Sequence, residues 1–167
     1  MRIALEPARR ENLEEYAAIL QAGRAFQQAQ GFIQWTEDYP NRNTVLEDLQ
    51  AGKGYALLVD GRIAGYMCVD FDGEPAYTEI DGAWGTEEPY AVVHRMAFGT
   101  DFQGKGLADT AFRQIEALCL SRGVQSIRMD TDFPNLRMQH ILEKNGFLKR
   151  GVIVFQGGGK LAYDKTL

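Results

Sequence analysis

The stretch Phe102-Gln-Gly-Lys-Gly-Leu-Ala108 joins an expected strand at residues 90–98 to an expected amphipathic helix at residues 104–122. Its two glycines allow a backbone to approach a ligand without a Cβ in the way. A helix start offers unpaired N–H groups and the positive end of the helix dipole, which together suit an anion. The stretch therefore predicts either a phosphate-binding loop or only a tight turn.

The helix after this stretch has the strongest pattern in the chain. Gly123 is placed to end it, and residues 125–130 then form a strand pattern. The order strand, helix, strand predicts a right-handed crossover between two parallel strands. The apolar face of the helix consists of Leu107, Ala108, Ala111, Phe112, Ile115, Leu118 and Cys119.

A nucleotide-binding P-loop is the competing interpretation of this region. Residues 99–105 match the first seven positions of G-x-x-x-x-G-K-[ST]. The eighth position is Gly106, which lacks the hydroxyl that would hold Mg²⁺. The sequence therefore disfavours an NTPase.

The remaining strand patterns predict an antiparallel start and a closing hairpin. Asp60-Gly61 is a strong turn signal between two of the early strands, and the three glycines at 157–159 join the last two. We expect strands at residues 1–5, 55–59, 63–71, 147–155 and 160–166.

The helix patterns and the loops complete a single α/β domain over residues 1–167. One helix begins near Leu13, a second is predicted from a Thr44–Glu47 capping box, and a fourth follows Pro134. Residues 31–40 and 72–89 lack a regular pattern, and the second segment is long enough to act as a lid.

Composition narrows the classes of function. The chain is 45% hydrophobic and 25% charged, which is typical of a globular protein, and no apolar run is long enough to span a membrane. A net charge of −5 argues against binding nucleic acid. The two cysteines show no disulfide or metal-ligand spacing, and with only His94 and His140 we expect no metal site. We expect a cytoplasmic protein.

The chain resembles the GNAT superfamily of acyl-CoA-dependent N-acetyltransferases. Gln103-Gly-Lys-Gly-Leu-Ala108 fits the family signature [Q/R]-x-x-G-x-[G/A], and residues 92–98 look like the strand that precedes it. Asn135 and Gly146-Phe147 resemble the ends of a second family motif. The resemblance implies a mixed sheet of about six or seven strands with one parallel crossover, flanked by about four helices.

The resemblance also implies acetyl-CoA as co-substrate. The family's central strand contacts the pantetheine arm and the thioester carbonyl through its backbone, and the signature loop binds the pyrophosphate. Asn135 matches a position that bonds the pantetheine, although Asn is also a good helix cap. Carried over, the cofactor-binding residues are Met96, Ala97, Phe98, Gln103, Gly104, Lys105, Gly106, Leu107, Ala108 and Asn135.

The catalytic groups are less well defined by the resemblance. Many relatives use a tyrosine to protonate the leaving thiolate, but Leu142 stands at that position. A CoA thiol has a pKa on the order of 8 to 9, so it can leave without a dedicated acid. His94 is the leading candidate for the base, because an imidazole accepts protons near neutral pH. Water and the loop acids Glu79, Asp81, Glu87 and Glu88 are its rivals.

The acceptor is expected to be a primary amine on a small molecule. The two irregular segments would border its site and contribute Trp35, Tyr39 and Trp84. A protein N-terminus or lysine remains an alternative acceptor, and a CoA-binding regulatory domain without turnover is an alternative function. A homodimer also stays open.

Overall fold

The computed structural model describes residues 1–167 and divides into two compact units. Residues 1–69 and 94–114 form the first unit, and residues 70–93 and 115–167 form the second. Strand β5 (Ala91–Phe98) and helix α3 (Leu107–Ser121) each contribute residues to both units. That the chain is one domain stays a prediction.

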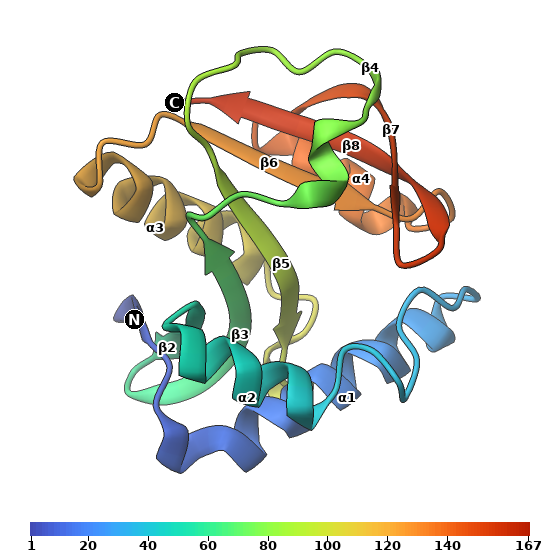
Figure 1. Ribbon diagram of the computed structural model, residues 1–167. Helices are drawn as coiled ribbons and strands as arrows, with labels where there is room; N and C mark the ends of the chain where they lie inside the picture. Colours follow the sequence, from blue (N-terminus) through green and yellow to red (C-terminus); the bar gives the residue numbers. More distant parts are fainter. The chain divides into compact units, whose positions relative to one another are not determined.

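The first unit combines antiparallel strands with two helices. Its strands are β1 (Ile3–Pro7), β2 (Gly54–Val59) and β3 (Arg62–Asp70), followed in the strand order by β5. The predicted Asp60-Gly61 turn is confirmed, since both residues have positive φ, 49° and 80°. Helices α1 (Leu13–Ala29) and α2 (Arg42–Ala51) pack against each other (Figure 1). Short 3-10 turns η1 (Arg10–Asn12) and η3 (Thr100–Phe102) complete the unit.

The entry of α2 differs from the prediction. Asn41, not Thr44, is the N-cap, and its side chain accepts a hydrogen bond from the Thr44 N–H at 3.2 Å. The Thr44 hydroxyl in turn accepts from the Asn41 N–H at 3.1 Å. Thr44 therefore belongs to a capping box, but as its third helical residue.

The second unit contains the remaining strands and the last helix. Strands β6 (Ser126–Thr131), β8 (Gly158–Thr166) and β7 (Leu148–Phe155) lie side by side (Figure 1), and α4 spans Leu136–Lys144. The first residues of β5 pair with β6 in parallel, at Ala91↔Ile127 and Val92↔Arg128. This parallel pair confirms the predicted crossover through α3.

The strand order of the sheet is β1-β2-β3-β5-β6-β8-β7-β4, which confirms the mixed α/β class. The eighth strand is β4 (Asp81–Gly82), which pairs with Val152 and Gly151 of β7 inside a segment expected to be a loop. A turn η2 (Pro75–Thr78) lies in the same segment. Strand β4 and turn η2 are too short to show a hydrophobic period in the sequence. Strand β4 also depends on partners that are distant in sequence.

Each unit has its own apolar core. In the first, Tyr16, Leu20, Val45 and Tyr66 are at most 2% exposed and pack with Ala97. In the second, buried Tyr77 of η2 packs with Val92, Ile153 and Ala162. The segment 72–89 is therefore held by a buried aromatic side chain. None of the helices combines the length and the apolar character that crossing a bilayer requires.

Candidate functional site

The loop before α3 is open at both of its glycines. Gly104 and Gly106 have φ of 71° and 73°, a region that favours glycine, and a Cβ built on either would meet no atom within 4 Å. Gly104, Lys105 and Gly106 are exposed, whereas Leu107 and Ala108 are buried beneath the first turn of the helix. The loop thus presents bare backbone to a ligand.

Gln103 fastens this loop to the first unit. Its side-chain amide donates to the carbonyl of Ala22 in α1 and to that of Phe98 at the end of β5, both at 3.2 Å. The Gly99 N–H also donates to the Ala64 carbonyl of β3 at 2.9 Å. Because the Gln103 amide bonds two carbonyls of the protein itself, its side chain positions the loop.

The start of α3 adds the electrostatic part of this site. The helix has 15 residues, and its first turn ends the loop at Leu107. Aligned peptide dipoles place a partial positive charge at such an end, and the Lys105 side chain adds a full charge beside it. The predicted residues 103–108 thus combine an exposed backbone with positive charge, and their binding of a diphosphate stays a prediction.

The other predicted cofactor contacts lie on β5, which ends where this loop begins. Met96 and Ala97 are buried, at 7% and 5% exposure. Phe98 packs on Gly65 of β3, where an added Cβ would lie 2.8 Å from the Phe98 ring. Their side chains thus serve as packing, so that any contact with pantetheine would come from their main chain. His94 is half-buried on the same strand.

Arg95 interrupts the regular conformation of β5. Its φ is 57°, and a left-handed residue that is not glycine costs about 1–3 kcal/mol unless its surroundings hold it. Strained residues of this kind often lie at functional sites. Sequence reasoning missed this position; a charged residue inside an apolar strand was the available signal.

An ion pair with Asp48 of α2 holds the Arg95 side chain. Nη2 and Nε of Arg95 donate to the two Asp48 carboxylate oxygens at 2.6 and 3.1 Å, and the side chains are 11% and 7% exposed. The Tyr66 hydroxyl donates to Asp48 at 2.6 Å. Burial, and then the Asp48 carboxylate, raises the pKa of Tyr66 far above its usual value, which keeps this donor protonated.

The predicted acceptor residues fall in different units. Trp35 packs against Gly23 of α1, and the Tyr39 hydroxyl accepts from Arg95 Nη1 at 2.7 Å, so both lie in the unit that holds the loop. Trp84 belongs to the second unit, where its indole N–H donates to the Tyr77 carbonyl at 2.9 Å. The Arg128 guanidinium stacks on Trp84 at 4.3 Å. Contact of the three aromatics with a substrate stays a prediction.

Asn135, in the second unit, caps α4. Its side-chain oxygen accepts from the Met138 N–H at 3.1 Å, and the residue is 7% exposed. The helix-capping role is therefore present. Its contact with pantetheine stays a prediction.

Asp130 is an acid near the end of β6 that sequence reasoning passed over. The Tyr77 hydroxyl donates to its carboxylate at 2.6 Å. Burial raises the pKa of Asp130 to about 6, even though Tyr77 and Lys160 favour the charged form. The burial that favours the protonated form of Asp130 has no signal in the local sequence.

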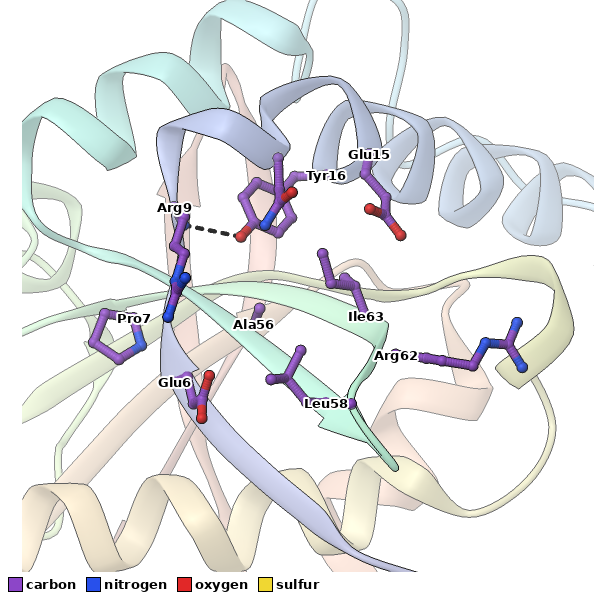
Figure 2. A pocket seen from close by; sticks show the side chains of 11 residues that line it. Glu6, Pro7, Arg9, Glu15, Tyr16, Ala56, Leu58, Arg62 and Ile63 are labelled. Carbon is purple, nitrogen blue, oxygen red and sulfur yellow. Dashed lines mark hydrogen bonds between the residues drawn. The ribbon is translucent and has the colours of Figure 1, made fainter.

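A cavity of about 490 Å³ lies elsewhere in the first unit, between β1, the start of α1 and the β2–β3 hairpin. Figure 2 shows that the apolar side chains of Ala56, Leu58 and Ile63 come from the β2–β3 hairpin. Charged side chains, among them Glu6 and Glu15, also line the cavity. None of the predicted site residues lines this cavity. It is distinct from the loop at the start of α3.

Metal and thiol chemistry find no support in the side chains. No group of three or more His, Cys, Asp or Glu residues is arranged to hold a metal ion. Both cysteines are buried, and burial raises the pKa of Cys119 to about 11, which disfavours a reactive thiolate.

Comparison with known proteins identifies the family of this fold. Residues 8–147 match the model of the acetyltransferase (GNAT) family. A GNAT-family acetyltransferase from Streptococcus agalactiae 2603 is 31% identical, with a TM-score of 0.88 over 99% of this chain and 95% of that one. A search of curated protein sequences gave no match.

More distant structures share the fold. A GNAT-family acetyltransferase from Listeria monocytogenes 4b F2365 is 18% identical, with a TM-score of 0.78 over 99% of this chain and 95% of that one. The acetyltransferase AAC(6')-Ib, in complex with paromomycin and acetyl-CoA, is 20% identical, with a TM-score of 0.74 over 99% and 94% of the two chains. With a family model that matches most of its length and a relative of this identity, the chain belongs to the acetyltransferase (GNAT) family.

Proposed function

We propose that this protein transfers an acetyl group from acetyl-CoA to the primary amine of a small molecule. The observation that carries the proposal is the open cradle at Gly104 and Gly106, at the positive end of α3. A diphosphate seated there would accept hydrogen bonds from backbone N–H groups of residues 103–108, with Lys105 at its edge. No metal ion is needed to hold it.

The reaction is the attack of a neutral amine on a thioester. The amine nitrogen bonds to the carbonyl carbon, the carbon–sulfur bond breaks, and the electron pair leaves with the sulfur. Main-chain groups of Met96–Phe98 would align the pantetheine and polarise the carbonyl, as in a preorganised oxyanion site. His94 would take the proton that the amine loses, and solvent would protonate the CoA thiolate.

A small polyamine is the acceptor that the charge of the chain and its relatives support best. The net charge of −5 favours a cationic partner. The segment expected to border the acceptor contains two bulky aromatic residues, Trp35 and Tyr39. Relatives of the same fold include the aminoglycoside acetyltransferase AAC(6')-Ib in complex with kanamycin. A protein acceptor would need an open groove, and bulky side chains at its border disfavour one.

One observation favours a second candidate, a CoA-binding regulatory domain without turnover. Leu142, at the position where the resemblance places a tyrosine acid, is fully buried in α4. A site without that acid has lost one means of protonating the leaving thiolate.

Release of the CoA thiol across an amine panel distinguishes these functions. The panel contains kanamycin, linear diamines, free amino acids and a peptide with both an amino terminus and a lysine. We expect turnover with at least one small amine and a much lower kcat/KM with the peptide. Preference for the peptide would favour the protein acetyltransferase, and acetyl-CoA binding without thiol release would favour the regulatory domain.

A further inference from the structure

Arg95 stands between two residues of the proposed reaction. It separates His94, the candidate base, from Met96, whose main chain would meet the thioester. Its φ of 57° departs from the extended conformation of the strand, so the backbone turns between His94 and Met96. A residue in this conformation persists only where its surroundings determine it.

Two elements outside β5 hold the guanidinium. Asp48 of α2 binds it with both carboxylate oxygens, at 2.6 and 3.1 Å, and is itself bonded by the Tyr66 hydroxyl of β3 at 2.6 Å. A bidentate pair that is almost fully buried leaves the arginine one orientation. The conformation of the strand therefore depends on α2 and β3.

The remaining guanidinium nitrogen reaches the segment between α1 and α2. Nη1 donates to the Tyr39 hydroxyl at 2.7 Å, and the guanidinium lies 5.8 Å from the centre of the Tyr39 ring. Tyr39 is half-buried, in the segment expected to border the amine. One side chain thus connects the acceptor segment with the strand expected to hold the donor.

We propose that Arg95 is a positioning residue that couples the acceptor segment to the acetyl-donor strand through Tyr39 and Asp48. The inference rests on the proposed function. When the amine orders residues 31–40, Tyr39 and the guanidinium transmit that order to His94 and Met96. Arg95 does not touch the reacting atoms, and it acts through the conformation of β5.

Tyr39→Phe tests the coupling, because it removes one hydroxyl and keeps the ring. Tyr16→Phe is the matched control: its hydroxyl accepts from the Arg9 N–H at 2.9 Å in the same unit. We expect Tyr39→Phe to lower kcat/KM for the amine at least tenfold, with the Kd for acetyl-CoA and the Tm close to those of the control. Arg95→Lys should lower kcat/KM at least as much, because it also breaks the bidentate pair with Asp48. The double variant should be at most twofold worse than Arg95→Lys, because the contact with Tyr39 is already lost in that single variant.

Equal kcat/KM for Tyr39→Phe and Tyr16→Phe would overturn the coupling, with the acetyltransferase function still standing. So would independent, multiplicative effects of the two changes in the double variant. Amide hydrogen exchange provides a readout without turnover: Arg95→Lys should accelerate exchange at residues 94–98 at least tenfold, and unchanged exchange would also overturn the inference. No thiol release by the wild-type chain would instead overturn the proposed function.

Discussion

Leu142 occupies the position where many relatives have the tyrosine that protonates the leaving thiolate. The residue is fully buried in α4, where the resemblance implies a hydroxyl acid. A thiol with a pKa on the order of 8 to 9 leaves as the thiolate without assistance. Under the proposed function, solvent would therefore protonate CoA.

The first prediction concerns Leu142→Tyr. We expect kcat to change by less than about tenfold, since the leaving group is already stable. Tyrosine is too large for this buried position, so the variant should lose about 1–3 kcal/mol of stability, a fall in Tm of roughly 2–12 °C. Leu136→Tyr is the control, because Leu136 of the same helix is 70% exposed and its replacement should leave the Tm unchanged. A hundredfold rise in kcat at Leu142 would contradict this account.

Asp130 gives a prediction about pH. Its pKa is raised from 3.8 to about 6 in the folded chain, with burial as the main cause. The folded state thus binds this proton more tightly than the unfolded state, so the stability it contributes is present below about pH 4 and is lost as the pH rises to 6. Asp130→Asn removes the charge, keeps an acceptor for the Tyr77 hydroxyl and should abolish this loss.

Denaturant unfolding between pH 4 and 7 measures the effect. The unfolding free energy of Asp130→Asn relative to wild type should increase by about 2–3 kcal/mol from pH 4 to pH 6 and then level off. Glu79→Gln is the control, since Glu79 is an exposed acid of the segment that carries Tyr77. Parallel wild-type and Asp130→Asn curves would show that the carboxyl group titrates at its ordinary value.

At the scale of the element, the proposed pyrophosphate loop is held by its attachments to neighbouring elements. The two hydrogen bonds of the Gln103 amide tie the loop to α1 and β5. The family signature specifies a long polar side chain at this position, and the structure gives the reason: the side chain reaches two carbonyls of neighbouring elements. Pre-ordering of this kind lowers the entropy lost on binding.

Gln103→Ala should therefore weaken acetyl-CoA binding without unfolding the chain. Loss of two part-buried hydrogen bonds is worth about 1–2 kcal/mol, which is a factor of roughly 5 to 30 in Kd. Gln27→Ala in α1 is the matched control, since its side chain accepts from the Trp35 N–H at 3.1 Å and bonds no residue of the loop. Isothermal titration of acetyl-CoA into both variants measures the two Kd values. Equal values would show that Gln103 does not position the loop for binding.

At the scale of the whole molecule, local patterns predicted the regular elements well. The apolar face after Gly106 predicted α3, and the Asp60-Gly61 pair predicted the hairpin between β2 and β3. The family, the enzyme class and the mixed sheet were also confirmed. The helix and the hairpin were predictable because their signals lie in residues close together in the sequence.

Features that depend on residues distant in sequence were not predicted. Strand β4 exists because Asp81 and Gly82 pair with β7, about 70 residues farther along the chain. The conformation of Arg95 follows from an ion pair with Asp48, and the raised pKa of Asp130 follows from its burial beside Tyr77. None of these has a local pattern, because the cause lies in another element.

The most direct test of the central claim is calorimetric titration of acetyl-CoA into wild type, Gly106→Ala and Gly123→Ala. The two glycines flank α3, have φ of 73° and 72°, and would meet no atom within 4 Å if a Cβ were added, so both substitutions carry the same strain. Only Gly106 lies in the proposed cradle. We predict that Gly106→Ala weakens binding at least tenfold and that Gly123→Ala stays within twofold of wild type. Equal affinities for the two variants would contradict the assignment of this loop to the pyrophosphate.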